Sequence, residues 1–438
     1  MNSTPRSHVP GGRSVAVIDG VRTPFLRSGT EFRDLTAYDL GRMAIAGLIH
    51  RNALDPASLG LVVLGTVIQD PNTSNLAREA ALAAGVPAAV PAFTVTAACI
   101  SANVAFRDAA RAVALGEVDA AIAGGAETLS DVPIRFRRPV RKRLIAAQKA
   151  RGPLGWMKLL RGLRLTDLAP DVPAIADFST GLTMGQNAER LVKRLGITRE
   201  VQDAYALESH RRAARAAEAG WFDDQILPAR VPPTFSAIVR DNGVRGDSTP
   251  EKMAALQPAF DRTFGTVTAA NSSYLTDGGS AVLLMSEERA RALGVPVLAR
   301  VLSEALVALE PLEELLVGPA VAIPKALERA GLALGDVDVV ELHEAFAGQV
   351  LAVLALLDDA EFARTRLGRT AAAGTIAGAR LNAWGGSLSI GHPFGATGGR
   401  LVAQCCRRLH RESGRFGLVA ACASGGLGYA AVLERVEP

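Results

Sequence analysis

The sequence predicts an α/β protein made of two similar halves, with an inserted segment in the first half. Three observations support this prediction. Buried-strand patterns alternate with amphipathic-helix patterns, the alternation stops for more than a hundred residues, and stretches near the start reappear near the end. Strands that alternate with helices are typical of a mostly parallel sheet with helices on both faces. At 438 residues with 49% hydrophobic content, the chain is long enough for two or three domains.

The first half begins with a buried strand at 14–25 and a helix at 35–52, whose apolar residues recur at helical spacing. The following elements are expected in this order: a strand at 59–67, a helix at 75–85, a strand at 92–99, a helix at 101–115 and a strand at 118–125. Strand patterns return at 265–273 and 278–286, and the alternation restarts after residue 297.

Residues 131–255 break this alternation with proline-rich turns and a charged helix at 198–221. Residues 131–164 hold eleven Lys or Arg against one acid, although the whole chain has a net charge of only +4. Such a segment attracts a polyanion, which is a nucleic acid, a lipid surface or a phosphorylated small molecule, unless it is simply a solvated helical face. No recognition motif and no regular interleaving of aromatic residues accompanies the charge, so we expect no nucleic acid partner.

Two pairs of stretches show the internal repeat. Residues 54–65 align without gaps with 332–343, and residues 115–125 resemble 413–423. Each member of the first pair reads as a helix exit, a turn and a buried strand. A single parallel-sheet domain is the alternative.

The repeat and the break together give the expected domain organisation. The predicted units are an N-terminal half at 13–130, completed by 256–290, an inserted loop domain at 131–255, and a C-terminal half at 297–436.

Composition excludes several classes of protein. The four cysteines show no CxxC pair and no Cys/His spacing of a metal site, so neither a disulfide framework nor zinc is indicated. The longest apolar runs, such as 350–357, fall far short of the ~20 residues of a membrane span. The first dozen residues lack an apolar core and read as a polar tail, so we expect a cytoplasmic protein. Their arginine and lack of acids resemble a transit peptide only faintly, since the stretch is short and not amphipathic.

Four reactive side chains are expected at strand exits: Cys99, His343, His392 and Cys422. The carboxyl ends of strands are where open α/β sheets place their active sites. A cysteine at a helix start has its pKa lowered toward neutrality by backbone N–H groups and the helix dipole, although a free cysteine is often only core. Two thiols near one candidate base suggest carbon–carbon chemistry on thioesters. By contrast, Cys405 and Cys406 lie in a helical pattern and read as core.

Five motifs carry a resemblance to the thiolase family, in the family's order from about residue 14 to 436: "AACISA", "GTVTAANSSYLTDGGSAVLLMS", "HEAF", "GGSLSIGHPFGATGGR" and "CASGGLGYAA". Within the family the chain resembles the 3-ketoacyl-CoA thiolases of fatty acid β-oxidation, particularly β subunits of trifunctional-type complexes and their bacterial counterparts. His343 stands where most thiolases carry Asn, and Ser424 stands where many carry Gly. The resemblance implies two α/β halves in a layered αβαβα arrangement with parallel-rich sheets, and an inserted loop domain.

The resemblance also implies a role for each site residue. Cys99 is the expected nucleophile, His392 activates it and later the CoA thiol, and Cys422 protonates the leaving acetyl-CoA carbanion. His343, with a water, and His392 are expected to hold one thioester oxygen. The N–H groups of Cys99 and Ser424 form the expected second oxyanion hole.

The family's CoA contacts suggest further residues along a binding tunnel: Met184, Arg245, Phe260, Ala269, Ser273 and Phe346. Since CoA and 3-ketoacyl-CoA are substrates, no cofactor or metal is expected. The resemblance implies a homodimer or tetramer and a CoA-binding role for the inserted domain at 131–255. Three roles stay open for the basic segment at 131–164: docking of CoA, a peripheral membrane contact, or contact with a hydratase/dehydrogenase α-subunit partner.

Three alternative functions stay open at this point. A biosynthetic acetoacetyl-CoA thiolase shares every catalytic residue. A ketoacyl synthase is disfavoured because it lacks the second catalytic cysteine, here Cys422. A non-catalytic lipid-binding relative would not require the nucleophile, the base and the second thiol.

Overall fold

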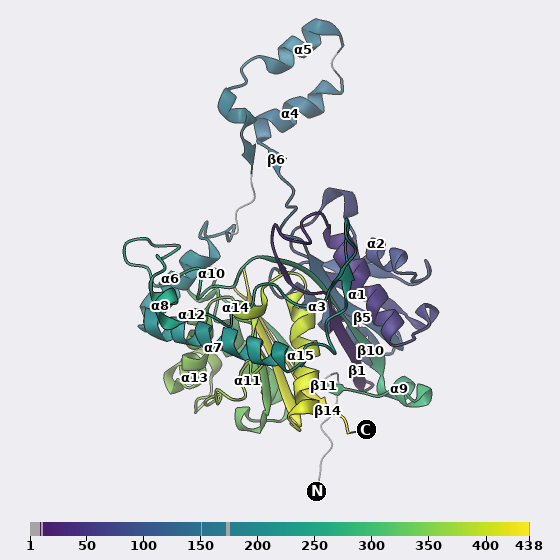
Figure 1. The fold of residues 1–438 in the computed structure, drawn as a ribbon, viewed down its shortest axis with the longest axis vertical. Helices are drawn as coiled ribbons and strands as arrows, with labels where there is room; N and C mark the ends of the chain where they lie inside the picture. Colours follow the sequence, from purple (N-terminus) through teal and green to yellow (C-terminus); the bar gives the residue numbers. More distant parts are fainter. Residues whose placement is uncertain (1–8, 10–11, 150, 172–175, 438) are drawn as a thin grey trace.

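The computed structural model describes residues 9, 12–149, 151–171 and 176–437. The predicted polar tail lies, apart from residues 9 and 12, outside the described residues. Two sets of strands build the central sheet (Figure 1). The N-terminal set is β1 (Val15–Arg22), β3 (Leu61–Gly65), β4 (Ala92–Val95), β5 (Ala120–Glu127) and β10 (Thr276–Ser286). The C-terminal set is β11 (Ala299–Ala308), β12 (Val339–Leu342), β13 (Phe416–Ala423) and β14 (Leu427–Arg435).

The two sets repeat one pairing pattern, which confirms the predicted halves. In the first, β3 runs parallel to β5, and β5, β10 and β1 follow in antiparallel order. In the second, β12 runs parallel to β13, and β13, β14 and β11 follow in antiparallel order. The aligned stretches 54–65 and 332–343 each form a 3₁₀ turn, η1 (Pro56–Ser58) or η4 (Leu334–Asp336), followed by a strand. The expectation of parallel-rich sheets was wrong, because antiparallel neighbours close each half and the sheet is mixed.

Helices lie on both sides of each set of strands. Between the two sets run α3 (Ser101–Ala114) and α15 (Thr397–Arg411); α3 packs on β3 and β5, and α15 packs on β1, β12 and β13. Buried side chains of both helices and both sets form one core cluster, which includes Val63, Phe106, Leu401 and Val419. The outer faces are covered by α1 (Ala37–Arg51) and α2 (Leu76–Ala83) in the first half and by α11 (Gly318–Ala330) in the second. This layering confirms the αβαβα arrangement.

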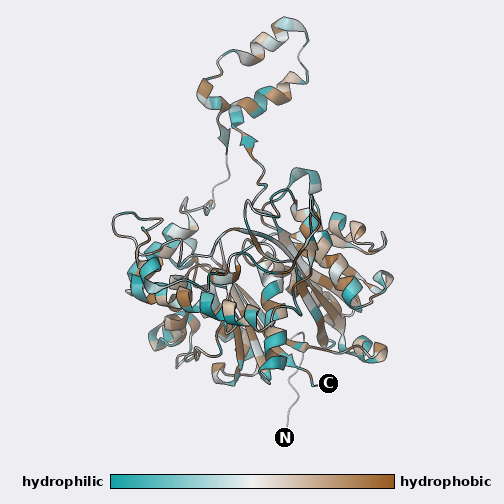
Figure 2. Ribbon diagram, in the orientation of Figure 1, coloured by the Kyte–Doolittle hydropathy of each residue, from teal (hydrophilic) through white to brown (hydrophobic). Residues whose placement is uncertain are grey.

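The segment between β5 and β10 contributes two kinds of structure. First, β6 (Arg135–Phe136), α4 (Arg138–Ala147), α5 (Gly152–Leu160), η3 (Leu165–Leu168) and β7 (Pro170–Asp171) form an arm that projects from the body. Second, α6 (Met184–Leu195) and α7 (Arg199–Glu218) pack against α12 (Ala347–Leu357). In Figure 2 hydrophobic residues concentrate in the strands of the sheet, whereas the arm mixes both kinds.

The remaining elements are short. They are β2 (Leu26–Arg27), η2 (Pro71–Thr73), β8 (Ala229–Arg230), β9 (Ala237–Ile238), α8 (Pro250–Ala254), α9 (Glu287–Leu293), α10 (Pro311–Glu314), α13 (Ala360–Leu367) and α14 (Ser387–Ile390). Within the described ranges, no helix combines the length and the apolar character needed to cross a bilayer.

The strand expected at 265–273 is instead an irregular segment before β10. Local side-chain hydrogen bonds explain the difference. The Asn271 side-chain oxygen accepts from the Thr268 N–H at 2.8 Å, and the Ser272 hydroxyl donates to the Thr268 carbonyl at 2.7 Å. Such bonds give the backbone an alternative to a sheet ladder.

Candidate active site

Cys99 lies in the turn between β4 and α3. The Ser101 hydroxyl donates to the Ala98 carbonyl at 2.7 Å and accepts from the Ala97 N–H at 2.9 Å, which holds this turn closed. Ala98 takes a left-handed conformation (φ +48°), which turns the chain sharply just before the cysteine. The thiol is half-buried. The N–H of Ser424, from the turn after β13, and the N–H of Cys99 itself both favour the thiolate form of this sulfur.

The pKa of Cys99 differs from the expectation. The protein atoms around the sulfur raise it to about 11, and the N–H of Ser424 and of Cys99 lower it by less. The predicted shift toward neutrality was therefore wrong, because removal of water from the thiolate outweighs the nearby N–H groups. At neutral pH this thiol keeps its proton and needs a base before it can act as a nucleophile.

His392 follows the one-turn helix α14 rather than a strand, so its expected place at a strand exit was wrong. Gly391 before it has φ +106°, and a Cβ there would lie 2.4 Å from a methyl carbon of Thr276. The Thr397 hydroxyl donates to the Pro393 carbonyl at 3.2 Å and lies 2.7 Å from Nδ1 of His392. Because the hydroxyl donates its proton to Pro393, its oxygen accepts a hydrogen bond from Nδ1–H of His392. The ring proton then lies on Nδ1, and the Nε2 atom of His392 is an acceptor without a partner among the described residues.

His343 stands directly after β12, and its ring centroid lies 4.1 Å from that of His392. The Cys99 sulfur, one ring nitrogen of His343 and one ring nitrogen of His392 all lie within 4.8 Å of one another. Both Nε2 atoms are buried and have no hydrogen-bond partner among the described residues. Burial, followed by the charge of Arg400, lowers the pKa of His392 to about 3, and burial also lowers the pKa of His343. Both rings are therefore neutral at pH 7.

Cys422 lies at the end of β13 and is 1% exposed. Burial raises the pKa of its thiol, and the nearby Cys99 raises it further. Gly425 (φ +80°) and Gly426 (φ +75°) take the left-handed positions of the following turn, so Ser424 does not need one. The structure thus brings all four predicted reactive side chains and the Ser424 N–H to one place.

Family comparisons agree with this arrangement. The profile described as "Thiolase, N-terminal domain" matches residues 15–288, and "Thiolase, C-terminal domain" matches residues 295–435. The chain belongs to the thiolase family.

Relatives of this thiolase include the mitochondrial trifunctional enzyme subunit beta of Bos taurus, 48% identical over 425 residues (97% of this chain and 89% of that protein). The 3-ketoacyl-CoA thiolase of Yersinia pestis is 44% identical over 423 residues, 97% of each chain. Among solved structures, human mitochondrial 3-ketoacyl-CoA thiolase has a TM-score of 0.83 at 30% identity, and Bacillus anthracis acetyl-CoA acetyltransferase 0.82 at 33%. Each covers 97% of this chain and 99% of the neighbour.

The residues predicted to contact CoA fall into two groups in this thiolase. Phe260 and Phe346 meet edge to face with ring centroids 6.1 Å apart, and Met184 packs in the same apolar cluster as Phe346 and Cys422. Ser273 is tied to this wall because its N–H donates to the Ala345 carbonyl at 2.9 Å. Arg245 and Ala269 are exposed and take no part in this apolar wall, whose own Phe260 is 37% exposed.

Sequence reasoning missed the buried polar residues that hold the site in place. The Glu127 carboxylate accepts from the N–H groups of Val67, Ile68 and Gly395, each at 2.9 Å, and so joins the first half to the His392 loop. Asp177, from the inserted segment, accepts from the Ser424 hydroxyl at 3.2 Å. Only their acidic character marks these residues in the sequence. Three further buried polar residues that hold the site in place are Ser387, Thr397 and Arg400.

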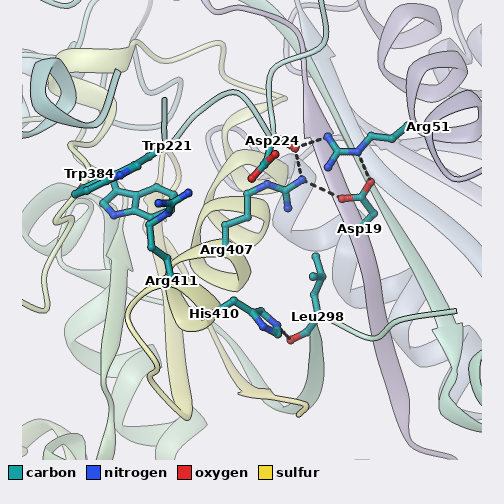
Figure 3. A pocket seen from close by; sticks show the side chains of 9 residues that line it. All are labelled: Asp19, Arg51, Trp221, Asp224, Leu298, Trp384, Arg407, His410 and Arg411. Carbon is teal, nitrogen blue, oxygen red and sulfur yellow. Dashed lines mark hydrogen bonds and ion pairs between the residues drawn. The ribbon is translucent and has the colours of Figure 1, made fainter. Parts of the chain in front are cut away.

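A cavity of about 460 Å³ lies at the C-terminal end of α15, and neither Cys99 nor Cys422 lines it (Figure 3). Its charges are largely paired internally, since Asp19 bonds Arg51 at 3.1 Å and Arg407 at 3.0 Å. It contains none of the predicted site residues. The lining residues are Asp19, Arg51, Trp221, Asp224, Leu298, Trp384, Arg407, His410 and Arg411. Cys405 and Cys406 are fully buried in α15, as predicted for core residues.

Proposed function

We propose that this protein is a 3-ketoacyl-CoA thiolase, which cleaves 3-ketoacyl-CoA with CoA into acetyl-CoA and a shortened acyl-CoA. The observation that carries the proposal is the placement of a half-buried thiol beside a neutral histidine whose Nε2 is a free acceptor, with a second thiol close by. Relatives named 3-ketoacyl-CoA thiolase at 44–48% identity support it.

In the first step the Cys99 sulfur attacks the 3-keto carbon while its proton passes to Nε2 of His392. The bond between carbons 2 and 3 then breaks, the acyl group stays on Cys99, and the carbanion of acetyl-CoA takes the proton of Cys422. The Ser424 N–H, which lies close enough to Cys99 to favour its thiolate, would stabilise the oxygen that becomes negative when CoA attacks the acyl-cysteine.

The second step transfers the acyl group to CoA. His392 first returns its proton to the Cys422 thiolate and so becomes an acceptor again. It then removes the proton of the CoA thiol, whose sulfur attacks the acyl-cysteine, and delivers that proton to the departing Cys99 sulfur. Both thiols and the histidine end in their starting protonation states, and no metal or redox cofactor is needed for the balance.

A biosynthetic acetoacetyl-CoA thiolase is the second candidate, because the solved structure of an acetyl-CoA acetyltransferase from Bacillus anthracis shares the fold at a TM-score of 0.82. A series of 3-ketoacyl-CoA substrates of increasing chain length separates the two. Release of acetyl-CoA from long substrates is the expected result. Activity confined to acetoacetyl-CoA would overturn the assignment to β-oxidation.

The arm is proposed as a peripheral contact with an anionic membrane. On α4 it carries exposed basic residues, and it presents large apolar side chains to solvent on both helices, with Ile145 68% exposed, Leu154 70% and Met157 61%. Basic and apolar groups side by side are typical of helices that lie in a membrane interface. A hydratase/dehydrogenase subunit is the alternative partner, since relatives are named beta subunits of a trifunctional enzyme.

The oligomeric state and location also stay proposals. The outermost strand of the first half, β4, has a free edge within the described residues and carries Phe93, which is 41% exposed. An unpaired edge with an apolar side chain favours pairing with a second copy, so we propose a homodimer. The cytoplasmic location remains a prediction.

A further inference from the structure

The unexplained feature of the site is a contact between His343 and a buried serine of α14. Nδ1 of His343 lies 2.8 Å from the Ser387 hydroxyl oxygen. The same oxygen accepts a hydrogen bond from Nη2 of Arg400 at 3.1 Å. Both Ser387 and Arg400 are fully buried, so neither side chain is exposed to solvent.

This pair of contacts decides where the ring proton of His343 lies. A guanidinium only donates, so the Ser387 oxygen acts as its acceptor and turns its own proton away from Arg400. Among the described residues, the single acceptor recorded for that proton is Nδ1 of His343. An unpaired buried hydroxyl is costly, so Ser387 donates to Nδ1 and the ring carries its proton on Nε2.

The two neighbouring rings therefore have opposite tautomers. Thr397 accepts from Nδ1–H of His392, so Nε2 of His392 carries no proton. Ser387 donates to Nδ1 of His343, so Nε2 of His343 carries the proton. Both Nε2 atoms are buried and have no hydrogen-bond partner among the described residues. One ring is thus ready to take the Cys99 proton, and the other is ready to donate to a substrate carbonyl.

Arg400 makes this orientation difficult to reverse. Its guanidinium lies 3.9 Å from the Glu341 carboxylate and 3.4 Å from the Gln404 side-chain oxygen, so α15 and β12 hold it from the far side. If the Ser387 hydroxyl turned its proton toward Arg400, two donors would face each other in a dry interior. That arrangement is unfavourable because the oxygen would lose a charge-assisted hydrogen bond.

We propose that Ser387, oriented by Arg400, is a positioning residue that locks His343 in its Nε2–H tautomer, so that His343 is a standing donor to the substrate carbonyl oxygen. The proposal rests on the thiolase function proposed above. It predicts that the hydroxyl group at position 387 matters, and that its removal harms the reacting complex more than the binding of substrate.

The test compares Ser387→Ala with Ser387→Thr, which keeps a hydroxyl, and with Ser389→Ala as the matched control. Ser389 is a buried serine of the same helix whose hydroxyl lies 3.0 Å from both the Gly386 carbonyl and the Ser209 hydroxyl and contacts neither histidine. Loss of one oxyanion donor costs about 10²–10³-fold in kcat, and loss of its orientation alone should cost about ten- to a hundredfold. We expect that loss in kcat, with a smaller change in KM, for Ser387→Ala, substantial recovery for Ser387→Thr, and wild-type values for Ser389→Ala.

The second readout is the tautomer itself, from ¹³C,¹⁵N spectra of the full-length histidine-labelled protein, with the His343 signal assigned by a His343→Asn variant. We expect Nε2–H in the wild type and a population of Nδ1–H in Ser387→Ala. An Nδ1–H wild type, or an unchanged tautomer in Ser387→Ala, overturns the proposal, and so does an unchanged kcat. If the wild type cleaves no 3-ketoacyl-CoA while the tautomer shifts as expected, the proposed function fails and the hydrogen-bond assignment stands.

Discussion

The turns in front of the two central helices, α3 and α15, occupy equivalent places in the two halves, yet they present opposite chemistry. One carries the acid Cys99 and the other carries the base His392. Burial raises the pKa of the thiol to about 11 and lowers that of the imidazole to about 3, so both groups are held neutral. The site therefore holds a neutral thiol and a neutral imidazole rather than a thiolate–imidazolium pair. Proton transfer is coupled to attack on the substrate.

Removal of the acid member should produce the largest effect. Cys99→Ala deletes the atom that holds the acyl group, and we expect thiolysis to fall by more than about 10⁴-fold, measured as acetyl-CoA release from 3-ketoacyl-CoA. The matched control is Cys405→Ala, because Cys405 is fully buried in α15 and takes no part in the site. Retention of full activity by Cys99→Ala would return the protein to the non-catalytic class.

Removal of the base member should have a smaller effect on rate, together with an effect on the pH dependence of stability. His392→Gln should lower kcat by about 10²–10⁴-fold. Between pH 6.5 and pH 3 the unfolded chain binds a proton at His392 that the folded chain does not, so stability falls as the pH falls, by about 1.4 kcal/mol per unit. His343 acts in the same direction.

Urea unfolding at pH 7, 6 and 5 measures this effect. The free energy of unfolding of His392→Gln should decrease less steeply on acidification than that of the wild type, because one of the two groups is gone. Identical slopes would contradict the low pKa of His392.

The same pair of turns shows how far the sequence could predict the site. Cys99, His343, His392 and Cys422 stand in motifs, and the repeat placed β3 and β12 in equivalent positions. Glu127, Ser387 and Arg400 act through side-chain hydrogen bonds to residues that are distant along the chain, such as Glu127 to Gly395, and no local pattern encodes such a contact. The pKa of Cys99 was mispredicted for the same reason, since the burial that raises it comes from packing.

The arm has no counterpart among the described residues of the second half, so its role is separate from that of the two equivalent turns. Reversal of Arg137, Arg138 and Lys142 to Glu removes three exposed cations from the arm. Each cation near an anionic membrane contributes about 1 kcal/mol, so association with phosphatidylserine vesicles should fall at least about tenfold, as measured by co-sedimentation.

The matched control reverses three exposed arginines of the body, Arg33, Arg211 and Arg289, with the same change in net charge. If the arm is the contact surface, this control keeps most of the vesicle binding, and the binding of the wild type weakens as the salt concentration rises. Equal losses in both variants would mean that net charge alone drives association. If the wild type does not bind vesicles, the membrane proposal is wrong, and a protein partner is the remaining explanation for the exposed apolar side chains of the arm.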